Sequence, residues 1–192
     1  MRIVGLFNNK GGVGKTTLAF HLAHMLPRIG TPTLAVDLDP QANLTASFFT
    51  EEKLEAIWED GAKRRTVFHC VEPIRKGTGD FDPPEPLDVE DGLHVICGDL
   101  RLSLFEDQLS DAWPRCYERR NESALRATSA FYRMIHDCSK TVGASLALVD
   151  LGPNLGAINR AALLAADYLF FPLEADMFSL QGLRNLGPTI QD

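Results

Sequence analysis

The sequence lacks several features that mark particular classes of protein. Its four cysteines, Cys70, Cys97, Cys116 and Cys138, are widely spaced and form no C-x-x-C pair, which argues against a disulfide framework or a cysteine metal site. No apolar run approaches the roughly 18 to 20 residues that span a bilayer. The first residues enter a strand pattern directly, so we predict no signal peptide. These absences favour a cytoplasmic protein with reduced thiols and no membrane association.

Positive charge is also scarce. Lys and Arg total 19 against 26 Asp and Glu, so the formal net charge is -7. A chain with this balance is a poor candidate for a dedicated nucleic-acid binder, although a local basic patch remains an open alternative. The chain has 192 residues, of which 45% are hydrophobic. That composition suits one globular domain with a sizeable core.

Short apolar runs alternate with helical stripes along the chain. The runs predict buried strands at Ile3–Phe7, Thr33–Val36, Leu93–Cys97, Ser145–Val149 and Tyr168–Phe171. The stripes predict helices over Thr16–Arg28, Glu51–Arg65 (facing solvent), Asn121–Gly143, Gly156–Ala166 and Phe178–Ile190. The opening strand, loop, helix and strand form a βαβ unit, whose strands are parallel. We therefore predict an α/β fold with a mostly parallel, doubly wound sheet, in which ligands bind at the carboxyl ends of the strands.

Two segments depart from this pattern. Residues 72–92 are rich in Pro, Gly and acids ("GTGDFDPPEPLDVEDG"), which predicts a mobile surface loop. The sequence reaches Asp192 just after a predicted helix, and no later strand closes the sheet. We therefore expect the fold to be incomplete at its C-terminus, as in a fragment or a truncated gene product.

The stretch "NNKGGVGKTT", Asn8 to Thr17, lies between the first predicted strand and helix. It matches the phosphate-binding pattern G-x-x-x-x-G-K-[ST] except that residue 9 is Asn9. The glycines let the backbone turn tightly and direct its N–H groups at phosphate oxygens, and the helix N-terminus adds its positive dipole. Lys15 is expected to reach the β- and γ-phosphates and Thr16 to ligate Mg²⁺. A plain glycine-rich turn is disfavoured, because Gly-Lys-Thr follows in the correct register.

Acidic residues follow two of the predicted strands. Asp37 and Asp39 lie in "VDLDPQAN", and Asp150 lies in "LALVDLGPN". A carboxylate in this position typically holds Mg²⁺ through water in phosphate-loop enzymes. Asp39 is a candidate for positioning an attacking water. The alternative is that each aspartate only caps the following turn or helix.

Three segments together resemble the ParA/MinD family of deviant Walker A ATPases, most closely its ParA/Soj branch. They are "KGGVGKTT", "VDLDPQANLTA" and "LVDLGPNLGAINRAALLAADYLFFPLEADMFSLQGL". The resemblance runs in order along the whole chain, apart from a lengthened middle. It implies that residues 1–192 form a single ParA-like, P-loop NTPase nucleotide-binding domain with ATP and Mg²⁺ as cofactors. It also implies a slow, partner-stimulated ATPase used in DNA, plasmid or chromosome partitioning or in cargo positioning.

The resemblance assigns roles to individual residues. Lys10 matches the family's signature lysine, which reaches the phosphates of a partner subunit and so implies an ATP-dependent homodimer. The alternative for Lys10 is a solvated surface lysine. Catalytic roles fall on Lys10, Lys15 and Asp39, and metal-binding roles fall on Thr16, Asp37 and Asp150. The nucleotide-binding residues implied are Lys10, Gly11, Gly12, Val13, Gly14, Lys15, Thr16 and Thr17.

The resemblance also implies two switch segments and has two departures. Pro40–Asn43 corresponds to switch I and Gly152–Asn159 to switch II. The family usually has Asp-x-Pro-Pro where this chain has Asp150-Leu-Gly-Pro, so we expect Gly152 to loosen switch II. The strands that carry adenine contacts, much of the dimer interface and most DNA-binding residues lie beyond this chain in the family. Arg160 and Arg184 are the remaining basic candidates, and lone helical arginines are usually only solvated.

Two other function classes remain open. One is a ligase-like enzyme on the same fold, for which the acidic segment Gly77–Gly92 is the available insertion, although its charge argues against an anionic substrate. An iron–sulfur relative is disfavoured, because Cys97 and Cys138 lack the paired spacing that a cluster needs. The other class is a nucleotide-binding regulatory or vestigial module without turnover.

Overall fold

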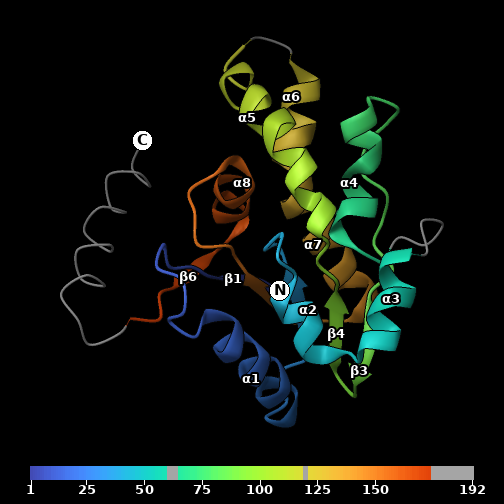
Figure 1. Cartoon of the computed structure of the whole chain (residues 1–192), viewed down its shortest axis with the longest axis vertical. Coiled ribbons are helices and arrows are strands. Elements are labelled where there is room, and N and C mark those ends of the chain that lie inside the picture. The colour runs from blue at the N-terminus through green and yellow to red at the C-terminus, as the bar shows by residue number, and fades with distance from the viewer. Residues whose placement is uncertain (60–64, 119–120, 174–192) are drawn as a thin grey trace.

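The computed structural model of this chain describes residues 1–59, 65–118 and 121–173. Within them, six strands form one sheet that lies between two groups of helices (Figure 1). The strands are β1 (Arg2–Leu6), β2 (Thr33–Asp37), β3 (Leu87–Glu90), β4 (Leu93–Ile96), β5 (Leu146–Asp150) and β6 (Tyr168–Phe170). The helices are α1 (Lys15–Arg28), α2 (Asn43–Phe48), α3 (Glu51–Glu59), α4 (Val67–Lys76), the 3-10 helix η1 (Leu100–Phe105), α5 (Glu106–Arg115), α6 (Glu122–Thr128), α7 (Ala130–Val142) and α8 (Ala157–Ala165).

The order of the strands across the sheet is β3-β4-β2-β5-β1-β6. All neighbours are parallel except β3 and β4, which are antiparallel. Asp150 at the end of β5 lies in register with Leu6 of β1 on one side and Asp37 of β2 on the other. The carboxyl ends of the three central strands therefore meet at one edge, which confirms the predicted α/β sheet. That a ligand binds at this edge stays a prediction.

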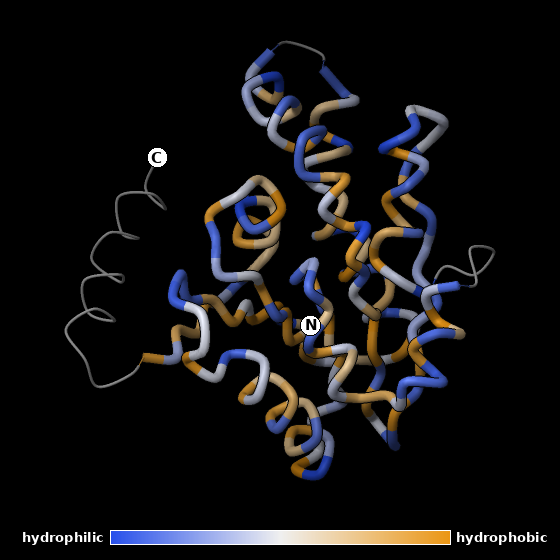
Figure 2. Tube along the Cα trace, in the orientation of Figure 1, coloured by the Kyte–Doolittle hydropathy of each residue, from blue (hydrophilic) through white to orange (hydrophobic). Residues whose placement is uncertain are grey.

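Alternating strand residues supply two separate cores, one on each face of the sheet. Leu6, Ala35 and Leu148 face α1, α2 and α3, whereas Ile3, Val36 and Val149 face α4 to α8. Figure 2 shows hydrophobic residues gathered along the strands and hydrophilic residues along the outer parts of the helices. Because central parallel strands are covered on both faces, they read as continuous apolar runs in the sequence.

The structure corrects the prediction of a loop over 72–92. The last turn of α4 extends to Lys76 and β3 occupies Leu87–Glu90, so within this range only residues 77–86 and 91–92 lie outside helix and strand. β3 is an edge strand, and Asp88 on it is exposed. Edge strands carry polar residues on their open side, which made this segment look like a loop. The mobility of residues 77–86 stays a prediction.

Two predicted helices also differ. The helix expected over Asn121–Gly143 is two helices, α6 and α7, that meet at Ser129. The helix expected over Glu51–Arg65 is described only as far as Glu59, Arg65 lies outside any helix, and Leu54 and Ile57 are buried rather than facing solvent. The segments η1 and α5 had no predicted assignment. The helix predicted over residues 178–190 and Arg184 lie outside the described residues.

Candidate functional site

The predicted phosphate loop connects β1 to α1. Gly12 has φ 79° and Gly14 has φ 82°, a left-handed conformation that glycine adopts without a steric penalty. Gly14 immediately precedes α1 as its N-cap and has no side chain with which to cap the helix. The first backbone N–H groups of α1 are therefore available to an anion, and the helix dipole favours negative charge at this position.

An open pocket of about 560 Å³ lies in front of this loop. One wall comes from the loop and the first turn of α1, and the opposite wall comes from α2. The lining residues are Gly12, Gly14, Lys15, Thr16, Thr17, Asn43, Ala46 and Ser47. The predicted loop and the end of the predicted switch I segment thus border one space.

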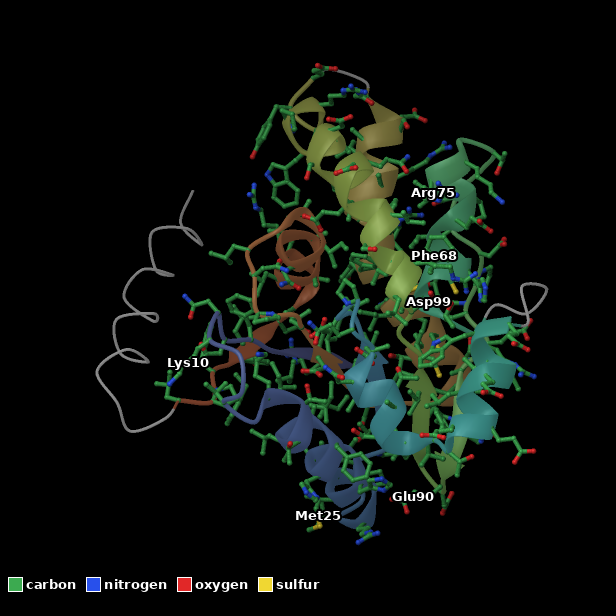
Figure 3. All side chains as sticks on the ribbon, viewed as in Figure 1. Lys10, Met25, Phe68, Arg75, Glu90 and Asp99 are labelled. Carbon is green, nitrogen blue, oxygen red and sulfur yellow. The ribbon has the colours of Figure 1, made fainter. Side chains whose placement is uncertain are left out.

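The start of the loop is anchored by Asn8. Its side-chain Nδ2 donates to the Pro172 carbonyl at 2.7 Å, and its Oδ1 accepts from the Lys10 backbone N–H at 2.9 Å. Asn8 is buried, whereas Lys10 lies at the periphery of the described molecule (Figure 3) and does not line the pocket. The structure therefore separates the two lysines of the loop. Lys15 points into the site, and Lys10 lies at its rim.

Thr16 and Asp150 join the loop to the end of β5. The Thr16 hydroxyl donates to Asp150 Oδ2 at 2.7 Å. Burial raises the pKa of Asp150 to about 6; the Thr16 hydrogen bond opposes that rise and the charge of Asp39 adds to it. Asp150 Oδ1 is buried and has no hydrogen-bond partner among the described residues. A buried carboxylate oxygen without a partner is costly, so a cation at this point would stabilise it.

Asp37 is held by the start of α2. Its Oδ2 accepts from both the backbone N–H and the hydroxyl of Thr45, at 2.8 and 2.7 Å, and its Oδ1 accepts from the Asp39 N–H at 3.2 Å. The Thr45 oxygen in turn accepts from the Gly98 N–H at 2.7 Å. Burial, followed by the charge of Asp150, raises the pKa of Asp37 to about 7 despite the bonds from Thr45. These contacts fix the pocket wall formed by α2.

Gly98 is essential to this arrangement for a steric reason. A Cβ at this position would lie 2.8 Å from Asp37 Cγ and 3.2 Å from Ala42 Cβ. Ala42 itself, the residue before α2, is the one described non-glycine residue with a positive φ, 54°. Strained backbone of this kind collects at functional sites and persists where surrounding contacts impose it.

The segment after Asp150 lies against Asp39. The Asp39 side chain accepts from the Gln41 N–H at 3.0 Å, and its Oδ1 would be 3.4 Å from a Cβ at Gly152. The buried amide of Asn159 donates to the carbonyls of Gly152 and Asn154 at 2.9 and 2.6 Å. The two predicted switch segments are therefore neighbours. Gly152 is tied to α8 here, and the expectation that it loosens the segment stays untested.

A second polar cluster continues from Gly98 to α3 and α4. The Gly98 carbonyl accepts from the Trp58 indole at 3.1 Å. The buried Asp99, labelled in Figure 3, begins this cluster. It binds Arg101 through both of its oxygens and accepts from the Thr66 hydroxyl at 2.9 Å. Arg101 lowers the pKa of Asp99 against the effect of burial, the largest influence on it. We interpret this cluster as structural, because its charges are paired with one another rather than directed at the pocket.

The donor set at the strand ends fits Mg²⁺, which prefers oxygen ligands and usually keeps several waters. Thr16 and Asp150 offer a hydroxyl and a carboxylate with one unpartnered oxygen. Among the described residues, no group of three or more His, Cys, Asp or Glu side chains could hold a metal ion alone. A metal here would therefore complete its ligands with water and phosphate oxygens.

Within the described residues, no helix is long and apolar enough to cross a membrane.

Sequence reasoning identified Lys15, Thr16, Asp37, Asp39 and Asp150, which the structure brings to one edge of the sheet. It did not identify Thr45 or Gly98. One signal could have pointed to Thr45. It is the third residue of α2, and the backbone N–H of a residue in that position can donate to a carboxylate that caps the helix. Gly98 had none, because its importance depends on the approach of a strand distant in sequence.

Arg160, a basic candidate for DNA, is exposed and its Nε donates to the Leu155 carbonyl at 3.0 Å.

Comparisons with known proteins show the family of this chain. Residues 1–192 match the family model AAA_31, described as an AAA domain. The chromosome partitioning protein ParA of Caulobacter vibrioides is 30% identical over 196 residues, which cover 100% of this chain and 62% of that protein. The chromosome-partitioning ATPase Soj of Thermus thermophilus is 30% identical over 194 residues, with coverage of 100% and 62%. The chain thus spans about three fifths of the length of these relatives.

A solved structure shows the same fold. The crystal structure of protein DIP2308 from Corynebacterium diphtheriae has a TM-score of 0.85 and 34% identity to this chain. The match covers 97% of this chain and 63% of that one.

Proposed function

The chain belongs to the AAA_31 family of AAA domains, with ParA-type P-loop ATPases among its relatives, and from this premise we propose that it binds Mg-ATP and acts as an ATP-dependent dimerisation switch. Its task would be the partitioning of DNA or the positioning of a protein cargo. The observation that carries the proposal is the Thr16–Asp150 hydrogen bond beneath a loop with two left-handed glycines. The Thr16 hydroxyl and the loop lie along the space that a nucleoside triphosphate would fill, and the buried Asp150 carboxylate accepts from that hydroxyl.

Each residue at the strand ends has a distinct role in this proposal. The N–H groups from Gly12 to Thr17 bind phosphate oxygens, and Lys15 neutralises the β- and γ-phosphates. Thr16 and Asp150 hold Mg²⁺, which supplies charge neutralisation when bound. Asp37 supports the metal from behind, because protein donors already engage both of its oxygens.

Hydrolysis would use a water placed by Asp39. Its carboxylate lies beside the backbone of Gly152, and its negative charge contributes to the raised pKa of Asp150. The water oxygen forms a bond to the γ-phosphorus, and the bond from that phosphorus to the β–γ bridging oxygen breaks. ADP leaves with the bridging oxygen, and inorganic phosphate leaves with the water's oxygen, its protons retained on the phosphate or released to solvent. Backbone N–H groups and lysine side chains stabilise the charge that develops on the phosphate.

Lys10 would act on the nucleotide of a second subunit. Its peripheral place outside the pocket (Figure 3) supports a role across an interface over a role within its own subunit. The part of the γ-phosphate neutralisation that Lys10 adds to that of Lys15 then depends on dimerisation. Association with DNA is a further part of the proposal, supported by relatives that are named as chromosome partitioning proteins. Regulation by a partner protein is also part of it and rests on the family resemblance alone.

The proposal is tested by light-scattering mass with and without Mg-ATP. Asp39→Ala provides the background in which hydrolysis is blocked, and Lys10→Ala is added to it. Lys140→Ala, an exposed lysine at the end of α7, is the matched control. We expect the mass to double with Mg-ATP in the background and in the control, and to stay monomeric with Lys10→Ala. Tight ATP binding with an unchanged mass in the background would refute the dimer.

Phosphate release separates the alternative functions. A vestigial or regulatory nucleotide-binding module binds ATP and releases no phosphate. A ligase-like enzyme releases phosphate only when its carboxylate substrate is present. Slow release from the unmodified protein alone, abolished by Asp39→Ala, supports the switch over both alternatives.

A further inference from the structure

Glu106, the first residue of α5, contacts the start of α8 across the helical layer. Its Oε1 accepts from the Ala157 N–H and its Oε2 accepts from the Ile158 N–H at 3.0 Å. α5 and α8 contact each other, and both lie on the same face of the sheet (Figure 1). A single carboxylate thus binds two successive backbone donors on another helix, 51 and 52 residues further along the chain.

The start of α8 needs such an external partner. The helix begins after Gly156, and no side chain from its own N-terminal segment caps it. The first N–H groups of any helix lack intrahelical acceptors, and a negative charge placed there also interacts favourably with the helix dipole. Glu106 supplies both the acceptors and the charge.

Gly156 makes room for this carboxylate. A Cβ at residue 156 would lie 3.0 Å from Glu106 Cδ and 3.0 Å from Asn154 Oδ1. The φ of Gly156 is -64°, which any residue adopts, so the backbone conformation does not require glycine. The requirement comes from the approach of Glu106.

The contact bears on the segment that follows Asp150. Only residues 151–156 separate that carboxylate from α8. Asn159, in the first turn of α8, ties the carbonyls of Gly152 and Asn154, and Gly152 lies beside Asp39. The path of the segment is therefore set at one end by β5 and at the other by the position of α8. Glu106 binds α8 at the point where that segment ends.

We propose that Glu106 is a positioning residue, which holds residues 151–156 in the arrangement that hydrolysis requires by binding the start of α8 from α5. This inference rests on the proposed function for its effect on turnover. Its structural part, the ordering of the start of α8, is independent of any nucleotide. It also makes α5 the element that would move if the segment rearranged after hydrolysis.

The test compares Glu106→Ala, Glu106→Gln and Gly156→Ala in the full chain. Asp107→Ala is the control, because Asp107 is an exposed acid in the same first turn of α5. Amide hydrogen exchange of the nucleotide-free proteins measures directly how well Glu106 protects the first N–H groups of α8. We expect Ala157 and Ile158 to exchange roughly tenfold faster or more in Glu106→Ala and Gly156→Ala, because a charge-assisted acceptor is lost. Glu106→Gln, which keeps one acceptor oxygen, should be intermediate, and Asp107→Ala should match the unmodified protein.

Turnover and ATP affinity are then measured on the same proteins. We expect Glu106→Ala to lower kcat roughly tenfold while the Kd for ATP changes less than about twofold, since the phosphate loop is untouched. Unchanged exchange at residues 157 and 158 overturns the inference, and so does an equal loss of binding and turnover. If the unmodified protein shows no turnover, the proposed function fails, and the exchange result alone then decides whether Glu106 orders this segment.

Discussion

Asp37 and Asp150 lie directly opposite each other, in register, at the carboxyl ends of β2 and β5. Both are buried, and burial raises the pKa of each, to about 7 for Asp37 and about 6 for Asp150. Two neighbouring buried carboxylates disfavour their charged forms. A divalent cation at this point would remove the conflict, which supports the metal site proposed above.

The first prediction concerns pH and uses Asp150→Asn. The pKa of Asp150 is raised from 3.8 to about 6, so between these pH values the native state binds more protons than the unfolded state. This carboxylate therefore lowers the free energy of unfolding as pH rises from about 4 to 6, by roughly 1.4 kcal/mol for each pKa unit. Thermal unfolding of the metal-free protein should show a flatter pH dependence in Asp150→Asn.

The same variant should lose stabilisation by Mg²⁺. For the unmodified protein we expect Mg-ATP to raise the melting temperature more at pH 8 than at pH 5, where Asp150 is protonated. Asp107→Asn, a surface acid, serves as the control. Equal pH slopes and equal Mg²⁺ effects in Asp150→Asn and the unmodified protein would contradict the prediction.

The second prediction concerns Thr45. Thr45→Val removes the hydroxyl that donates to Asp37 and accepts from Gly98, leaving a buried carboxylate and a buried N–H short of partners. We expect a loss of roughly 1–3 kcal/mol in the free energy of unfolding, together with weaker ATP binding, because α2 forms a wall of the pocket. Thr45→Ser keeps the hydroxyl and should retain most of the stability and most of the ATP affinity. Thr141→Val, which removes an exposed hydroxyl bonded to the Asp137 carbonyl, is the control in denaturant titrations.

The third prediction concerns Gly98. Its alanine variant places a Cβ 2.8 Å from Asp37 Cγ, so either Asp37 or the end of β4 must move. Overpacking of this kind typically costs about 1–3 kcal/mol. Gly79→Ala, where a Cβ meets nothing within 4 Å, should change stability by less than about 0.5 kcal/mol. Equal melting temperatures for the two variants would show that Asp37 is not tightly held.

The fourth prediction separates backbone strain from nucleotide binding. Gly14 and Gly30 have nearly the same φ, 82° and 84°, and a Cβ would meet nothing within 4 Å at either. Gly14→Ala and Gly30→Ala should therefore destabilise the protein similarly, by about 1–2 kcal/mol. Only Gly14→Ala should also weaken ATP binding, measured by calorimetry, because Gly14 lines the pocket. Equal ATP affinity in both variants would place the nucleotide elsewhere.

Much of this architecture could be predicted from the sequence, and for identifiable reasons. The central strands are covered on both faces, so apolar runs such as Thr33–Val36 locate them to within about a residue. The spacing of Gly12, Gly14 and Lys15 locates the phosphate loop, because that chemistry is local. Asp37 and Asp150 follow their strands directly, and parallel pairing brings strand ends together.

The remaining features depend on contacts between distant segments. β3 lies at the edge of the sheet, where polar residues such as Asp88 are exposed. The alternation of buried and exposed residues that identifies a strand is therefore weak in β3. The requirement for glycine at residue 98 arises only when Asp37 lies against it. Glu106 reads as an ordinary acid in the first turn of a helix, and nothing local shows that it binds α8.

The place of β1 between β5 and β6 has a consequence for synthesis of the chain. β1 is made first, yet its two sheet neighbours begin at residues 146 and 168, and Thr16 cannot reach Asp150 before then. At about 5–20 residues per second, the phosphate loop would wait seconds to tens of seconds on the ribosome without its partner strands. A nascent chain should therefore gain ATP affinity abruptly, near the end of translation of these residues, and the apolar β1 is the segment most in need of a chaperone until that moment.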